Sequence, residues 1–432
     1  MSDVKTVKVA LAGCGTVGSG VAEIVINRGA ALADRTGLRF EIVKALVSDA
    51  SKKRDLPFDS SRLTDDPADL NGVDADMVVE VMGGTDRARE VVLNALKRGI
   101  PVVTANKALL SHHGVEIYET ARKGNTCIAF EASCAGGLPI IGALLRGLQA
   151  NRNTSIMGIF NSTCNFILTE MLSGGATYDD ALRSAQQAGY AEADPTLDVG
   201  GGDTAHKLTI LASLAFGLNL DGDQVAMEGI QGIALTDLQI VEELGFSCKL
   251  LGMGRRGVDD RVSLSVHPTL VPHSQTLAGM SATSSGVVVQ GDVVGETFYS
   301  GAGAGSLPTA SAVVADMIEV ASGSAQKTFD QLRIYNDRTK PAAYLPSGDR
   351  TYSYYVRVPV SQSTDSATCS DQLRSTSLNW QQVESMSAHD SVVGITEVMG
   401  ESAFQKSLDE VRVALSLSEP PKFIRILPQE TN

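Results

Sequence analysis

Residues Val7–Gly18 read VKVALAGCGTVG, and this stretch carries the clearest structural signal in the chain. Its first half, Val7–Ala12, is a short apolar run that ends at glycines, which is typical of a buried strand. From Val17 to Val25 the apolar residues recur with helical spacing. The stretch therefore predicts a strand, a tight glycine turn and a helix.

The turn itself fits the GxGxxG pattern, and its place between a strand and a helix gives that pattern its weight. The first glycine permits the sharp turn, the second lets the backbone approach a pyrophosphate, and the third allows close packing of helix on strand. The N-terminus of the helix attracts the anion. We therefore expect a bound dinucleotide at Gly13, Gly15, Thr16, Val17 and Gly18.

The sequence is compatible with either NAD or NADP as the cofactor. The fingerprint usually has an acidic residue about 20 positions after the glycines, which holds a ribose hydroxyl. Here the second strand ends later, and Asp49 follows it. Asp49 favours NAD, whereas the run Lys52, Lys53 and Arg54 offers a 2′-phosphate site and favours NADP.

Further strands alternate with helical segments through the first third of the chain. Apolar runs at Phe40–Val47 and Met77–Val81 each precede a helical pattern, and Pro101–Thr104 is predicted to be another strand. This alternation predicts an α/β fold of the Rossmann type, with a doubly wound parallel sheet.

The kinds of residue in the chain change near Ile128 and again after Ala321. A glycine-rich stretch at 301–305 precedes a helical run that is expected to return to the first domain. The polar segment from Ala321 to about Arg350 is predicted to be a linker, Tyr352–Val360 an edge strand and Gln405–Ser416 an amphipathic helix. The predicted domains are residues 1–132 with about 303–325 (dinucleotide-binding), 133–302 (α+β, to which the family resemblance described below assigns substrate binding and dimerisation) and 350–432 (a small α+β tail).

Composition restricts the class of partner. With 432 residues and 43% apolar content the chain can fill two or three cores. A net charge of -14 argues against nucleic acid as a partner. The six scattered cysteines are predicted to be thiols in a reducing compartment, and no segment has the pattern of a signal peptide or a membrane span. A cytoplasmic protein is expected.

Two later motifs carry candidate catalytic groups. Thr104 and Lys107 belong to TANK, which follows an apolar strand and so lies at the carboxyl edge of the sheet, where cofactors bind. Glu192, Asp203 and Lys207 belong to an acidic, glycine-punctuated run. A helix that begins near Asp203 would place Asp203 and Lys207 on one face, either as an ordinary ion pair at a helix start or as part of a site.

Together these motifs resemble the homoserine dehydrogenase family, in order and spacing, over residues from about 7 to 320. The resemblance rests on GCGTVG, TANK, EASCAGGLPII, NSTCNFIL, GYAEADPTLDVGGGDTAHK and GAGAGSLPTASAVVAD. It implies that the chain interconverts L-aspartate 4-semialdehyde and L-homoserine in threonine and methionine biosynthesis. It also implies roles for four side chains: Lys207 as the acid/base, Lys107 in contact with cofactor and substrate, and Glu192 and Asp203 as holders of the amino-acid substrate.

The resemblance further implies a structural Na⁺ ion and a closing loop. Carbonyl groups of the segment that contains Glu131, Cys134, Gly136 and Leu138 would bind the ion, and Gly303 with Gly305 would cover the cofactor. The tail resembles an ACT regulatory domain, although residues 361–365 read SQSTD where that domain has an Asp-x-Pro-Gly turn. A homodimer or homotetramer is expected.

Two rival functions stay open at this point. Another Rossmann amino-acid or semialdehyde dehydrogenase would need a catalytic cysteine or histidine in place of the lysines. A sensor that only binds NAD(P) would need the glycine loop and nothing more.

Overall fold

The computed structural model describes residues 4–280, 282–360 and 366–428. The chain forms two compact units, and each is made of several segments. Unit 1 comprises residues 1–160, 205–224 and 283–342. Unit 2 comprises residues 161–204, 225–282 and 343–432.

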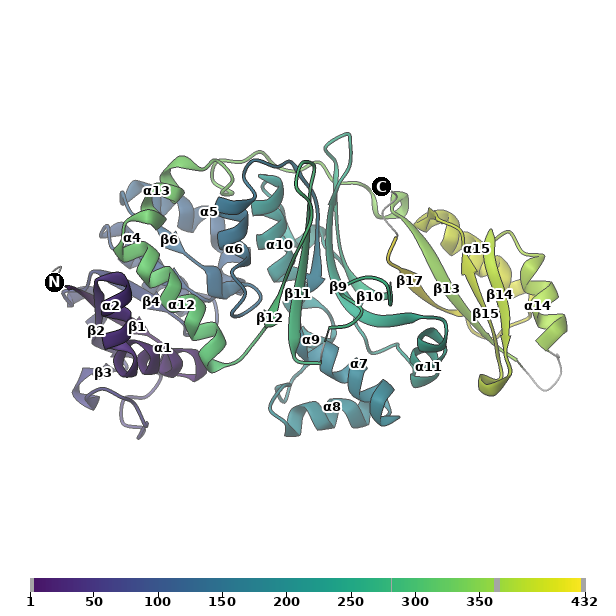
Figure 1. The fold of residues 1–432 in the computed structure, drawn as a ribbon, viewed down its shortest axis with the longest axis horizontal. Coiled ribbons are helices and arrows are strands. Elements are labelled where there is room, and N and C mark those ends of the chain that lie inside the picture. The colour runs from purple at the N-terminus through teal and green to yellow at the C-terminus, as the bar shows by residue number, and fades with distance from the viewer. Residues whose placement is uncertain (1–3, 281, 361–365, 429–432) are drawn as a thin grey trace. The chain divides into compact units, whose positions relative to one another are not determined.

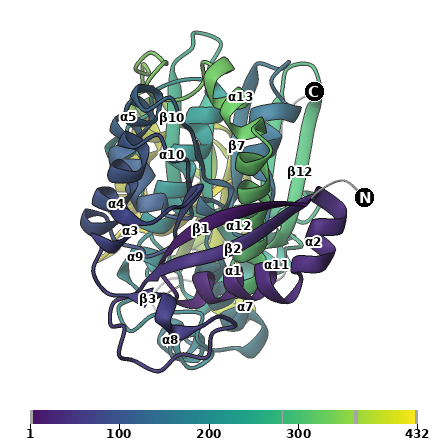
Figure 2. The same cartoon turned by 90° about the vertical axis from the view of Figure 1, so that its left-hand side faces the viewer.

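The parallel sheet of unit 1 has six strands in the order β3-β2-β1-β4-β5-β6. Every neighbouring pair in it is parallel, and Figure 2 shows β1 beside β2. The strand order reverses next to β1, which is the point where doubly wound sheets bind ligands. This confirms the predicted fold class. The strands are β1 (Lys5–Ala12), β2 (Leu38–Leu46), β3 (Leu63–Thr64), β4 (Met77–Glu80), β5 (Val102–Thr104) and β6 (Ile128–Ala129).

Helices cover this sheet because their apolar faces pack into its core. The fully buried strand residues Val9, Leu11 and Val79 share a cluster with residues of α1 and α12. A Cβ on Gly20 would approach Ser306 Oγ to 2.7 Å, so the absence of a side chain on Gly20 lets α1 and α12 come close together. The helices of this part are α1 (Thr16–Asn27), α2 (Gly29–Thr36), α3 (Asp69–Gly72), α4 (Asp86–Lys97), α5 (Lys107–Lys123), α12 (Ser306–Ala321) and α13 (Ser324–Gln331).

Unit 1 also contains three antiparallel strands, in which β11 pairs with β7 on one side and β12 on the other. The central strand β11 is almost wholly buried. Most of the long helix α10 belongs to the same unit. The elements are α6 (Ile140–Gly142), a π-helical turn (Ala143–Gly147), β7 (Asn153–Ile159), α10 (Gly202–Phe216), β11 (Ser284–Gly291) and β12 (Gly295–Ala302).

Unit 2 begins with helices and continues into a mixed sheet. The long strands β9 and β10 pair antiparallel along their whole length, and β8 pairs with β10 in parallel. Helices α7 and α11 pack on β9. The elements are α7 (Ser162–Gly174), α8 (Tyr178–Gln187), α9 (Thr196–Val199), β8 (Ala226–Met227), α11 (Leu235–Glu243), β9 (Phe246–Arg256) and β10 (Val262–Pro272).

The tail of unit 2 has the order βαββαβ, and its strands lie in the order β17-β13-β15-β14 (Figure 1, green-yellow to yellow). This is the split-βαβ arrangement of ferredoxin-like domains. Its last strand, β17, continues the sheet by pairing in parallel with β10. The elements are β13 (Thr351–Pro359), α14 (Ser366–Arg374), β14 (Trp380–Met386), β15 (Ser391–Thr396), β16 (Met399–Gly400), α15 (Glu401–Ala414) and β17 (Lys422–Ile426).

Two local predictions are wrong. The strand predicted at Tyr352–Val360 is not an edge strand, because β13 lies between β15 and β17 and is buried along most of its length. The predicted linker contains the helix α13, whose Phe329 is fully buried. Both errors have the same cause: a moderately polar segment becomes interior when distant parts of the chain cover it. Residues 361–365, where the ACT turn would lie, fall outside the described residues.

Candidate active site

The glycine loop has the backbone geometry that its sequence predicts. Gly13 has φ +108°, and a Cβ there would lie 2.6 Å from the carbonyl oxygen of Val81. A Cβ on Gly18 would lie 1.9 Å from the carbonyl oxygen of Gly13. By contrast, apart from its two neighbours in the chain, no atom of the described residues lies within 4 Å of a Cβ built on Gly15, the N-cap of α1. The loop therefore leaves open space beside Gly15 at the N-terminus of a helix, which suits a phosphate group.

The loop is also tied to the start of α12. The hydroxyl of Ser306 donates a hydrogen bond to the carbonyl oxygen of Thr16, at 2.6 Å. Gly305, with φ +116°, is the N-cap of α12. Ser306 was not among the predicted residues. Its hydrogen bond to Thr16 depends on the packing of α1 against α12, which the sequence does not show.

Thr104 closes β5 with a fully buried side chain. Its hydroxyl donates to Glu80 Oε2 at 2.6 Å and accepts from the backbone N–H of Asn106 at 3.0 Å. Burial raises the pKa of Glu80 against the effect of these hydrogen bonds. The hydroxyl of Thr104 thus links the end of β5 to Glu80 on β4 and to the backbone of Asn106. Lys107 follows as the first residue of α5 and is half-buried.

Lys207 lies on the second turn of α10, and its ammonium donates to the carbonyl oxygen of Phe160 at 2.7 Å. The positive charges of Lys207 and Lys107 both act on the thiol of Cys134. The Cys134 thiol also contacts the carbonyl oxygen of Lys207 at 3.8 Å. The backbone of Lys207 therefore lies beside Cys134, and Lys107, Lys207 and Cys134 all belong to unit 1.

Asn161 organises the carboxylates of unit 2. Its side-chain amide donates to Asp198 Oδ1 at 2.7 Å and to Asp203 Oδ2 at 2.9 Å, and its Oδ1 caps α7 by accepting from the N–H of Cys164. One nitrogen bonded to both acids holds the two carboxylates close together. Asp203 is buried, whereas Glu192 is exposed on the loop that leads to α9.

Asn161 is the main residue that sequence reasoning missed. It opens the NSTCN segment directly after β7, and its neighbour Phe160 supplies the carbonyl oxygen that holds Lys207. An asparagine between a strand and a helix is a familiar N-cap signal. Its second set of bonds, to two acids far along the chain, has no local signature.

The segment from Glu131 to Leu138 packs against the loop before α12. A Cβ on Gly136, which has φ +57°, would lie 2.4 Å from the carbonyl oxygen of Gly303. The Glu131 carboxylate accepts hydrogen bonds from the backbone N–H groups of Ile141 and Gly142, at 2.8 and 2.6 Å. Burial nevertheless raises the pKa of Glu131 to about 7. Cys134 and Leu138 are buried.

The buried thiols are unsuited to nucleophilic chemistry. Burial raises the pKa of Cys134 to about 12, although Lys207 and Lys107 act in the opposite direction. It raises the pKa of Cys14 to about 11 and that of Cys127 and Cys248 to about 12. A cysteine nucleophile works as the thiolate. These four thiols stay protonated near neutral pH.

Two surveys cover the described part of the chain alone. Among residues 4–280, 282–360 and 366–428, no group of three or more His, Cys, Asp or Glu side chains is arranged to hold a metal ion. Within the same ranges, no helix combines the length and the apolar character needed to cross a membrane.

A parallel sheet with a glycine loop at its switch point, and Lys107 directly after the end of β5, is typical of the NAD(P)-binding domain of an oxidoreductase. Residues 13–131 match the family model of the homoserine dehydrogenase NAD-binding domain, and residues 139–318 match that of homoserine dehydrogenase itself. The chain belongs to the homoserine dehydrogenase family. Membership of this family does not favour either rival function, another Rossmann dehydrogenase or a sensor that only binds NAD(P).

Individual relatives agree with this assignment. The chain is 43% identical to the homoserine dehydrogenase of Neisseria gonorrhoeae over 358 residues, which is 82% of each sequence. It is similar to the crystal structure of a homoserine dehydrogenase from Thiobacillus denitrificans, with a TM-score of 0.87, 36% identity and 98% coverage of both chains. A hyperthermophilic archaeal homoserine dehydrogenase in complex with NADPH matches with a TM-score of 0.61 and 26% identity, over 74% of this chain and 98% of that one.

Proposed function

We propose that the protein interconverts L-aspartate 4-semialdehyde and L-homoserine, with Lys207 as the group that moves the proton. The observation that carries this proposal is the position of the Lys207 ammonium, which donates to the carbonyl oxygen of Phe160, the residue before Asn161, whose amide bonds to Asp203. The reaction belongs to the biosynthesis of threonine and methionine, and its substrate is a small amino acid.

A bound nicotinamide supplies the hydride for aldehyde reduction and accepts it in the reverse direction. The protein must then deliver a proton to the oxygen that becomes an alkoxide. An ammonium has three N–H groups. One N–H of Lys207 bonds to Phe160, which fixes the direction of the side chain. Its positive charge stabilises the developing negative oxygen, and another of its protons completes the alcohol.

Asp203 and Glu192 are proposed to bind the ammonium of the amino acid. Asp203 is buried and shares the amide of Asn161 with Asp198. A carboxylate in this position attracts the positive ammonium of an amino acid. Glu192 is exposed on a loop that is punctuated by Gly189, whose φ is +77°. Glu192 is therefore proposed to contact the substrate when this loop approaches it.

The cofactor is proposed to lie along the glycine loop, with Thr104 and Lys107 at the end of β5 and Gly305 at the start of α12. The open backbone at Gly15 supports this placement for the pyrophosphate. Thr104 would contribute its backbone, because its hydroxyl already bonds to Glu80 and to the N–H of Asn106.

NADP is proposed as the preferred cofactor. The Asp49 carboxylate accepts from both the N–H and the hydroxyl of Ser51, so it is engaged within its own loop. The guanidinium of Arg54 donates to the carbonyl oxygens of Asp49 and Lys52, and its charge reaches Cys14 in the glycine loop. With Lys52 and Lys53 it would hold a 2′-phosphate.

We expect Arg54→Ala to raise the KM for NADPH about tenfold or more, because a charge-assisted hydrogen bond is lost, and to change the KM for NADH little. Steady-state kinetics with both cofactors measures this. Arg39→Ala, which removes an exposed arginine at the start of β2, is the matched control. Equal effects of Arg54→Ala on both cofactors would refute the assignment.

A structural Na⁺ is proposed at the carbonyl groups of Glu131, Cys134, Gly136 and Leu138. The side chains offer little to a metal, because the Glu131 carboxylate is bonded to two backbone N–H groups and the Cys134 thiol is protonated. Backbone carbonyls are the hard oxygen ligands that such a cation prefers. Thermal unfolding in NaCl and in choline chloride at equal ionic strength tests this, and identical Tm values would count against the site.

We also propose the organisation of the whole chain. Residues 1–132 with about 303–325 form the dinucleotide-binding domain, 133–302 the substrate-binding and dimerisation domain, and 350–432 an ACT-like domain, whose βαββαβ order supports that likeness. Assembly is proposed as a homodimer or homotetramer, to be checked by sedimentation. The buried thiols support a reducing compartment, the cytoplasm.

The purified protein is expected to oxidise L-homoserine with NADP⁺, followed as the appearance of NADPH absorbance. L-Serine and L-threonine serve as alternative substrates. The proposal fails if L-homoserine gives no turnover while another amino acid does.

A further inference from the structure

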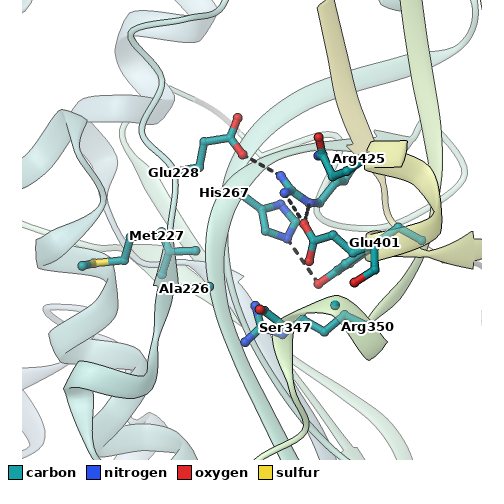
Figure 3. A pocket seen from close by; sticks show the side chains of 13 residues that line it. Ala226, Met227, Glu228, His267, Ser347, Arg350, Glu401 and Arg425 are labelled. Carbon is teal, nitrogen blue, oxygen red and sulfur yellow. Dashed lines mark hydrogen bonds and ion pairs between the residues drawn. The ribbon is translucent and has the colours of Figure 1, made fainter. Parts of the chain in front are cut away.

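A cavity of about 540 Å³ lies in unit 2, and the residues that line it include none of those proposed for catalysis (Figure 3). Its size is within the range of small-molecule sites. Its wall combines β8 and β10 with the tail, namely the turn at 347–349, β13, the start of α15 and β17. Parts of the chain that are far apart in sequence therefore meet around it.

Three of the charged groups in the wall form one ion-paired cluster, in which a single arginine is shared by two carboxylates. Arg425 donates to Glu228 at 2.6 Å and to Glu401 at 3.1 Å. His267 is buried among positive charges, because Arg425, Arg255 and Arg350 all act on it, and it carries no charge near neutral pH. This side of the cavity offers a ligand no unbalanced cation.

Arg350 is the exception. Only 8% of its surface is exposed, and its Nε has no hydrogen-bond partner within the described ranges. Its backbone is held on both sides, since its N–H donates to the carbonyl oxygen of Ser347 and its own carbonyl oxygen accepts from the N–H of Glu401. Figure 3 shows Arg350 with Ser347 at the opposite end of the cavity from Glu228. A buried guanidinium with an unused N–H is costly unless an anion meets it.

The start of α15 points to the same kind of ligand. This helix of 14 residues begins at Glu401, and its N-cap, Gly400, provides no side-chain cap. Ser402 and Gln405, on its first two turns, line the cavity. The N–H of Glu401 already bonds to the carbonyl oxygen of Arg350, and the N–H groups of the residues that follow it favour a negative group.

We propose that this cavity binds a small organic molecule through a carboxylate or phosphate group, which Arg350 holds. The fork of N–H groups on a guanidinium matches both anions. The rest of the ligand carries no second negative charge, because Arg425 is already shared by Glu228 and Glu401. Its body packs on the apolar surface of Met227, Val266 and Tyr352. The proposal is independent of the dehydrogenase function.

Isothermal titration calorimetry of the full chain with acetate, butyrate and inorganic phosphate tests the site. We expect saturable binding of at least one of these anions, and carboxylates and phosphate in separate titrations distinguish the two sources of charge. Arg350→Met should weaken that binding about tenfold or more, because the charged hydrogen bonds are lost.

Arg350→Lys keeps the charge and serves if the methionine variant does not fold, as judged by circular dichroism. It should also weaken binding, because lysine lacks the planar fork. Arg374→Met, which removes an exposed arginine of α14, is the matched control and should bind like the native chain. Absence of binding to every anion, or equal binding by the Arg350 variants, would overturn the proposal.

Discussion

Lys207→Ala should lower kcat for L-homoserine oxidation by about 10²–10⁴-fold, the usual contribution of a positioned proton-transfer group. The substitution removes both the proton and the positive charge at the substrate oxygen. It also removes the hydrogen bond to the carbonyl oxygen of Phe160. Cofactor affinity should stay within about twofold, because the residues proposed to bind the pyrophosphate lie elsewhere in unit 1, on the loop before α1.

The measurement is a steady-state assay together with a fluorescence titration of NADPH. Lys123→Ala is the control, because Lys123 is an exposed residue at the end of α5 that pairs only with Glu119 among the ion pairs described. Lys207→Arg separates charge from proton transfer: it keeps the cation but is a poor acid near neutral pH. Retention of full kcat by Lys207→Ala would refute the role of Lys207.

Asp203→Asn should lower kcat/KM for L-homoserine by about 10- to 100-fold, as expected for the loss of a hydrogen bond to a charged group. The change is nearly isosteric, and its side-chain oxygen can still accept the hydrogen bond from Asn161. The negative charge alone disappears. Because the substrate ammonium is the proposed partner of that charge, KM should rise more than kcat falls.

Asp194→Asn is the matched control for this variant. Asp194 is exposed and accepts a hydrogen bond from the N–H of Thr196 within its own loop. We expect its kinetics to match those of the native chain. Thermal unfolding of both variants shows whether the fold is retained. If Asp203→Asn folds normally and its KM is unchanged, the assignment of Asp203 to the substrate is wrong.

The cofactor-binding end of the molecule was predictable because its signals are local. Val7–Ala12 becomes β1, and the helix predicted after it becomes α1, which begins at Thr16. Gly13 and Gly18 lie where the backbone leaves no space for a Cβ. A glycine pattern of this kind reports constraints among residues that are close together in the chain, so the sequence alone reveals it.

Contacts between segments that are far apart in the sequence could not be predicted from local sequence patterns. Asn161 bonds to Asp198 and Asp203 from the start of α7, and Ser306 bonds to Thr16 from the start of α12. At the first position the sequence shows an asparagine that can cap a helix, and at the second it shows a serine. It does not show which residue either side chain bonds to. Similarly, β13 was predicted as an edge strand because its own alternation does not reveal that β17 covers its second side.

By itself, the sequence determined the α/β class, the glycine loop and the family, since periodicity and motif spacing are properties of the chain in one dimension. Only the tertiary structure decided that Asn161 joins two acids and that Arg350 is buried with an unused N–H beside a cavity. Burial and hydrogen bonding depend on which segments meet in space. The cavity has five separate stretches of chain in its wall, and no one of them contains a motif for it.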